Sequence, residues 1–128
     1  ICFASEFIIS ILNKIKPPYN VNQLTQDKAL ERLNDLDGVK QEVSSILEQR
    51  SLLAKELLQI PFIKKIYASD ANFLLAKVDD ANQRYSQLIK MGIVARNRTT
   101  QPLCENCLRF TIGTEEENKR LIKILNQL

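Results

Sequence analysis

The stretch CLRFTIGTEEEN, residues 107–118, joins two patterns that together predict an α+β fold. Its first half, Leu108–Ile112, is a short apolar run that contains one arginine and is typical of a strand. Thr114 with Glu117 three residues later is a capping-box pattern, which predicts the start of a helix. That last helix has one apolar face, made by Leu121, Ile122, Leu125 and Leu128.

Three further apolar runs, residues 62–67, 73–78 and 93–96, predict the rest of a small sheet of three or four strands packed on helices. The turn-forming residues 69–72 separate the first two runs. Asp80 with Gln83 is a second capping-box pattern. It predicts a helix that Gly92 terminates.

The first 60 residues are mainly helical in pattern. Ser5 is a suitable cap for a helix that ends before Pro17 and Pro18, and Asn22 for a second helix. The residues Asp35–Gly38 predict a break, and a longer helix follows from about Val39 to Leu58. We therefore expect a single domain, residues 1–128, that is mainly helical over 1–60 and α+β over 61–128, with no linker dividing it.

The charge and the amino-acid composition of the chain argue against some classes of function. The chain has 128 residues, a net charge of +3 and 6% aromatic residues, and no basic run is longer than the pair Lys64 and Lys65. These values do not favour a nucleic-acid or anionic-membrane partner. No apolar stretch is long enough to span a bilayer. Residues 1–4 resemble the end of a buried strand, so we expect a chain entered in the middle, without a signal peptide.

The chain has no histidine and only three cysteines. Histidine is the usual proton shuttle at neutral pH and a common metal ligand, so we expect no metal site. The few cysteines favour reduced thiols in the cytoplasm. Cys104 and Cys107 have the spacing of a redox dithiol or of half a zinc site, but they lie in a loop that leads into a strand. We interpret them as structural and leave the redox reading open.

Arg96 and Arg109 are the strongest candidates for a binding role. Each lies in an apolar strand pattern, where a guanidinium needs an anionic partner or must reach solvent. Residues 81–113 contain five basic residues and only one acid, Glu105. An arginine fork pairs well with a carboxylate or phosphate, which favours a binding role. The alternative is that the two arginines point to water from edge strands or form salt bridges within the chain.

Five segments occur together in a pattern that resembles the histidinol-phosphate aminotransferases, and the resemblance covers essentially the whole chain. They are Pro17–Asn22, Ile60–Phe62, Ser69–Phe73, Ile93–Arg96 and Cys107–Thr114, the last followed by Glu117 and Asn118. The resemblance implies the small C-terminal domain of a fold-type I enzyme that uses pyridoxal 5'-phosphate. The upstream domain with the Schiff-base lysine would be absent from this chain.

The resemblance also implies a reaction and its site. The family transfers an amino group between glutamate and imidazole-acetol phosphate, giving 2-oxoglutarate and histidinol phosphate, in histidine biosynthesis. Its members are homodimers. Arg109 matches an arginine that holds the substrate's carboxylate or phosphate, Arg96 a second anion-binding arginine, and Tyr19 and Asn20 a turn near the active site. We expect the isolated chain to be inactive.

Two other functions fit the same pattern. A related enzyme, such as threonine-phosphate decarboxylase or another aminotransferase, shares single segments. A chain of this fold could also be a stand-alone binding domain without catalysis.

Overall fold

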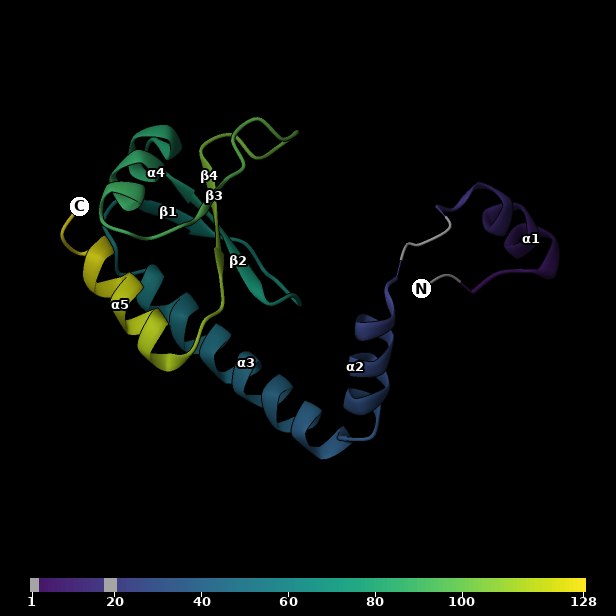
Figure 1. Cartoon of the computed structure of the whole chain (residues 1–128). Helices are drawn as coiled ribbons and strands as arrows, with labels where there is room; N and C mark the ends of the chain where they lie inside the picture. The colour runs from purple at the N-terminus through teal and green to yellow at the C-terminus, as the bar shows by residue number, and fades with distance from the viewer. Residues whose placement is uncertain (1–2, 18–20) are drawn as a thin grey trace. The chain divides into compact units, whose positions relative to one another are not determined.

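The computed structural model describes residues 3–17 and 21–128 (Figure 1). The chain divides into two compact units, Ile1–Val39 and Lys40–Leu128. The division falls about twenty residues before the change of pattern at residue 60 that the sequence indicates. That the whole chain belongs to one domain of a parent enzyme remains a prediction.

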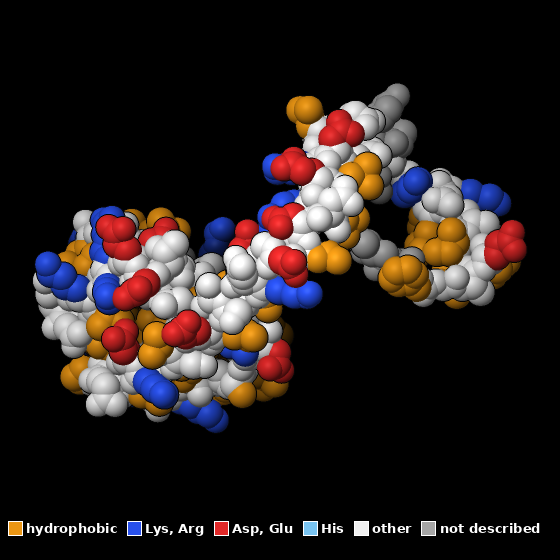
Figure 2. Space-filling view, turned by 90° about the horizontal axis from the view of Figure 1, so that it is seen from below, with side chains coloured by type: hydrophobic (Ala, Val, Ile, Leu, Met, Phe, Trp, Pro, Cys, Tyr) orange, Lys and Arg blue, Asp and Glu red, His pale blue; other side chains and the backbone are white. Residues whose placement is uncertain are grey.

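The first unit contains two short helices and the first turn of a third. Helix α1 spans Glu6–Ile15 and α2 spans Gln23–Leu33. The Asn22 side chain caps α2 by accepting from the backbone N–H of Thr25 at 2.9 Å. Ser5 stands at the N-cap of α1, as expected, but its side chain makes no capping hydrogen bond. Neither helix has a buried residue, and Figure 2 shows hydrophobic side chains (orange) at the surface of this unit.

Helix α3 spans Leu36–Leu57 and begins three residues before the expected start at Val39. The reason is a cap, because the Asp35 carboxylate accepts from the backbone N–H of Gly38 at 3.0 Å. Gly38 therefore lies in the first helical turn. The expected break at 35–38 is only the short junction between α2 and α3.

The second unit contains one antiparallel sheet of four strands. They are β1 (Ile63–Ile66), β2 (Phe73–Val78), β3 (Arg96–Asn97) and β4 (Cys107–Thr111), in the spatial order β1-β2-β4-β3. The expected sheet of three or four strands, packed on helices and preceded by a helical segment, is confirmed. Its register places Leu75 of β2 opposite Arg109 of β4.

The strand expected over 93–96 is wrong over most of its length. Only Arg96 of this run pairs with β4. The backbone N–H of Ile93 donates instead to Leu88 at 2.9 Å and so closes the end of α4 (Ala81–Lys90). Gly92 makes this closure with φ = 76°, a conformation that favours glycine.

The core lies on one face of the sheet. Residues of β2 alternate between buried and half-buried positions, so Leu74, Ala76 and Val78 face the core. Helix α4, helix α5 (Glu115–Leu125) and the C-terminal half of α3 cover this face. We call the opposite face, which carries Phe73, Leu75 and Lys77, the open face.

The two capping boxes differ in the structure. In α5 both halves are present, since Thr114 accepts from Glu117 N–H and the Glu117 carboxylate accepts from Thr114 N–H. In α4 the Asp80 carboxylate accepts from the N–H groups of Asn82 and Gln83. The return contact to Asp80 N–H comes from the carboxylate of Asp79 rather than from Gln83.

Candidate anion-binding site

Arg96 and Arg109 lie directly opposite each other on neighbouring strands. Side chains of directly opposed residues share one face of a sheet. Arg109 also lies opposite the half-buried Leu75, so both arginines belong to the open face. The register of three strands thus brings together the two residues that the sequence singles out.

The Arg109 side chain lies against an aromatic ring and keeps one nitrogen without a hydrogen-bond partner. Its side chain is half-buried and its central carbon lies 4.9 Å from the centroid of the Phe73 ring. Its Nε is buried and has no hydrogen-bond partner. Leaving a buried donor unpaired costs about 1–3 kcal/mol, and an anion that accepts from the guanidinium would recover it.

Arg96 adds a second positive charge to the open face, directly opposite Arg109. Within residues 3–17 and 21–128, neither arginine takes part in an ion pair. Like charges directly opposite each other repel, so an anion between them would relieve the repulsion. Two planar forks can bind a carboxylate or a phosphate through several charge-assisted hydrogen bonds.

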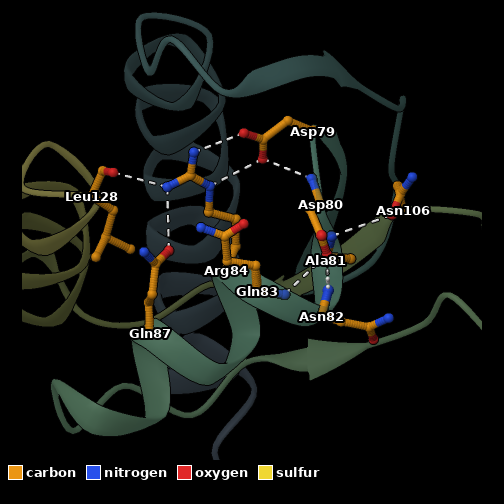
Figure 3. A network of polar contacts seen from close by, with 9 residues as sticks. All are labelled: Asp79, Asp80, Ala81, Asn82, Gln83, Arg84, Gln87, Asn106 and Leu128. Carbon is orange, nitrogen blue, oxygen red and sulfur yellow. Dashed lines mark hydrogen bonds and ion pairs between the residues drawn. The ribbon is translucent and has the colours of Figure 1, made fainter.

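Arg84, another basic residue of the segment 81–113, forms hydrogen bonds with other groups of the chain (Figure 3). Its guanidinium donates to both carboxylate oxygens of Asp79, at 3.0 and 2.7 Å, and to the backbone oxygen of Leu128 at 2.8 Å. It also lies 4.1 Å from the centroid of the Phe62 ring. The hydrogen bonds from Arg84 lower the pKa of Asp79 to about 2. Arg84 is therefore a structural residue.

The turn before β2 orients Phe73. Ser69 Oγ donates to the backbone oxygen of Phe73 at 2.6 Å, and Arg50 of α3 donates to that of Ala71 at 2.9 Å. The sequence pattern predicts a turn at 69–72 but does not indicate that Phe73 contacts Arg109. The alternation in β2 places Phe73 on one face, but only the register with β4 places that face beside Arg109.

The remaining candidates from the sequence are Tyr19 and Asn20 and the two cysteines Cys104 and Cys107. Tyr19 and Asn20 lie outside the described residues. Cys104 is half-exposed and Cys107 is buried, and both are free thiols. Burial raises the pKa of the Cys107 thiol, which makes it a poorer nucleophile. Over the described ranges, no cluster of His, Cys, Asp or Glu could hold a metal ion.

The sequence of the chain also matches a known protein family. Residues 1–125 match the model of the aminotransferase class I and II family. The chain belongs to this family. None of the helices in the described ranges is long and apolar enough to cross a membrane.

Among curated proteins the chain is similar to histidinol-phosphate aminotransferases. It is 69% identical over 128 residues to that of Flavobacterium johnsoniae and 59% identical to that of Christiangramia forsetii. In both cases the match covers all of this chain and 37% of the relative. The chain thus spans little more than a third of the length of these relatives.

Solved structures agree on the fold. The histidinol-phosphate aminotransferase from Clostridium acetobutylicum matches with a TM-score of 0.86 at 26% identity, over 94% of this chain and 37% of that one. A decarboxylase from Sulfurospirillum multivorans matches with a TM-score of 0.76 at 21% identity, over 94% of this chain and 36% of that one. The second likeness shows the fold alone. The expected fold class is confirmed.

Proposed function

We propose that this chain is the substrate-binding C-terminal part of a histidinol-phosphate aminotransferase. The observation that carries the proposal is the opposed pair Arg96 and Arg109 on the open face, with Arg109 Nε buried and unpaired. The identity of 69% to a curated relative with this name supports it. The parent enzyme would use glutamate or 2-oxoglutarate and histidinol phosphate.

The arginine pair suits both half-reactions. One substrate carries carboxylates and the other a phosphate ester, and a guanidinium fork accepts either group. Arg109 would hold the substrate by hydrogen bonds from its fork, with the Phe73 ring fixing the plane of the guanidinium. Arg96 would add a second charge from the opposite strand and orient the same anion.

The donor set of this chain fits an anionic substrate. Pyridoxal 5'-phosphate, which we assign to the remainder of the parent, would supply the electron sink for transamination. This chain's share is binding and orientation. Holding the substrate in a productive position accounts for a large part of catalysis in many enzymes.

The test is the replacement Arg109→Lys in the complete parent enzyme. Lysine keeps the charge but loses the bidentate fork, so kcat/KM should fall about 10- to 100-fold. The measurement is steady-state kinetics with histidinol phosphate and 2-oxoglutarate. Lys123→Gln, an exposed change on α5, is the matched control and should leave kcat/KM unchanged. Equal kinetics in the Arg109→Lys and wild-type enzymes would contradict the assignment.

Substrate choice separates this proposal from a related enzyme. The sequence resemblance leaves threonine-phosphate decarboxylase as the alternative, so threonine phosphate is the second substrate to try. We expect the parent to convert histidinol phosphate and to leave threonine phosphate unchanged. Release of carbon dioxide from threonine phosphate would select the decarboxylase instead.

The parent's assembly and location complete the proposal. We infer a cytoplasmic homodimer that binds no nucleic acid and no membrane. Analytical ultracentrifugation of the parent should give the mass of two subunits.

A further inference from the structure

Each of the four strands places one cation on the open face. Arg96 and Arg109 face each other across β3 and β4, and Lys65 and Lys77 face each other across β1 and β2. Lys77 lies opposite Cys107, two residues before Arg109 in β4. Lys77 and Arg109 are therefore diagonal neighbours, whose side chains start about 7–8 Å apart. The lysine pair and the arginine pair therefore lie on the same face of the sheet as two neighbouring groups.

A shift of register creates the lysine pair. Ile63 pairs with Val78, whereas Lys65 pairs with Lys77, so two steps along β1 correspond to one step along β2. Lys64 is the extra residue of this β-bulge. Bulges re-aim side chains and are frequent beside functional sites. Here the bulge puts Lys65 opposite another lysine and also returns Ile66 to the core face, opposite Ala76.

The lysine pair has no counter-charge. Within the described ranges, neither Lys65 nor Lys77 forms an ion pair with an acidic side chain. Lys77 is half-buried, and the Lys65 ammonium is held 4.8 Å from the centroid of the Tyr67 ring. Like charges directly opposite each other destabilise a sheet. An arrangement that costs stability and stays unneutralised fits an anion better than it fits a structural role.

We propose that Lys65 and Lys77 form a second oxyanion subsite, distinct from the arginine pair, which binds the phosphate group of a small ligand. Two ammonium groups act as compact point charges and suit a doubly charged phosphate. The inference does not depend on the proposed aminotransferase activity, because it concerns different residues.

The experiment titrates inorganic phosphate into the 15N-labelled 128-residue chain at constant ionic strength, with chloride as the balancing ion. We expect saturable shifts of the backbone amide signals of Lys65 and Lys77. Lys77→Gln should weaken this binding at least about five-fold, the effect of losing one of two charged partners. Lys64→Gln is the matched control, because it removes a lysine from the same strand, and should leave the binding unchanged.

A variant without the two arginines tests whether phosphate binds at the lysines independently of the proposed substrate site. In the double variant Arg96→Gln, Arg109→Gln, the lysine signals should still shift and saturate with phosphate. Loss of the shifts in that background would show that phosphate binds only the arginine pair and would overturn the subsite. Shifts that never saturate, or that weaken equally in Lys64→Gln, would also overturn it, as general screening of a basic surface.

Thermal stability gives an independent readout. Without phosphate, Lys77→Gln should melt at the wild-type temperature or above it, because the repulsion with Lys65 is gone. With saturating phosphate, only the chain with both lysines should gain stability, since a ligand stabilises the state that it binds. A lower melting temperature of Lys77→Gln without phosphate would show a structural role for Lys77.

Discussion

Arg84 illustrates how one side chain connects parts of the second unit that are distant in sequence. Besides Asp79 and Leu128 it donates to Gln87 one turn later in α4, at 3.2 Å, and its side chain is only 13% exposed. It thereby connects the end of β2, helix α4 and residue 128 (Figure 3). The sequence pattern placed it only among the basic residues of 81–113. Its acceptors become visible only in the folded chain.

The pairing with Arg84 predicts a pH dependence of stability. The pKa of Asp79 is about 2 in the folded chain, below its usual value of 3.8. The carboxylate therefore stabilises the fold above pH 4, and this contribution is lost as the pH falls toward 2. Asp79 is 38% exposed, so solvent screening reduces the contribution to about 1 kcal/mol. Asp79→Asn should lower the free energy of unfolding at pH 6 by this amount, and by much less at pH 2, where about half of the Asp79 carboxylates are protonated.

Urea denaturation at both pH values measures the difference. Asp70→Asn, an exposed change in the turn before β2, is the matched control and should follow the wild-type curve. A wild-type and an Asp79→Asn curve that stay parallel from pH 6 to pH 2 would show that the ion pair does not stabilise the fold.

Helix ends were the most predictable elements. Asn22, Asp80 and Thr114 all cap the helices that they were expected to begin. A capping residue acts on backbone groups two or three positions away, so its effect can be predicted from the local sequence. The earlier start of α3 has the same local origin, because Asp35 accepts from the N–H of Gly38 three residues later. The shortness of β3 has a different origin, because the N–H of Ile93 donates to Leu88 of α4 and not to β4.

At this scale we predict the effect of removing the α5 cap. Thr114→Ala loses the acceptor for Glu117 N–H and should lower the free energy of unfolding by about 1 kcal/mol. Thr114→Ser keeps the hydroxyl and should retain most of the stability. Chemical denaturation compares the three chains. Equal losses in the Ala and Ser variants would assign the effect to the methyl group rather than to the cap.

For the whole molecule, the chain covers 37% of the length of its curated relatives, and its proposed role is binding rather than proton transfer. We therefore predict that the 128-residue chain does not transaminate. With glutamate, imidazole-acetol phosphate and added pyridoxal 5'-phosphate, formation of 2-oxoglutarate should stay at the level of a protein-free control. The complete parent enzyme, assayed beside it, is the positive control. Turnover above the blank would show that this chain contains its own catalytic groups.

Short-range sequence patterns predict many of the helices and strands in the structure. Caps, alternation and turn residues act over two to five positions, which is why most helices, the strand β2 and the number of strands follow from them. The pattern also singled out Arg96 and Arg109, because a guanidinium in an apolar run is unusual. Tertiary structure decided the rest. Strand register placed the two arginines opposite each other and Phe73 beside Arg109, and the bulge at Lys64 set Lys65 opposite Lys77. Pairing between strands depends on packing across the whole sheet, so local sequence does not determine it.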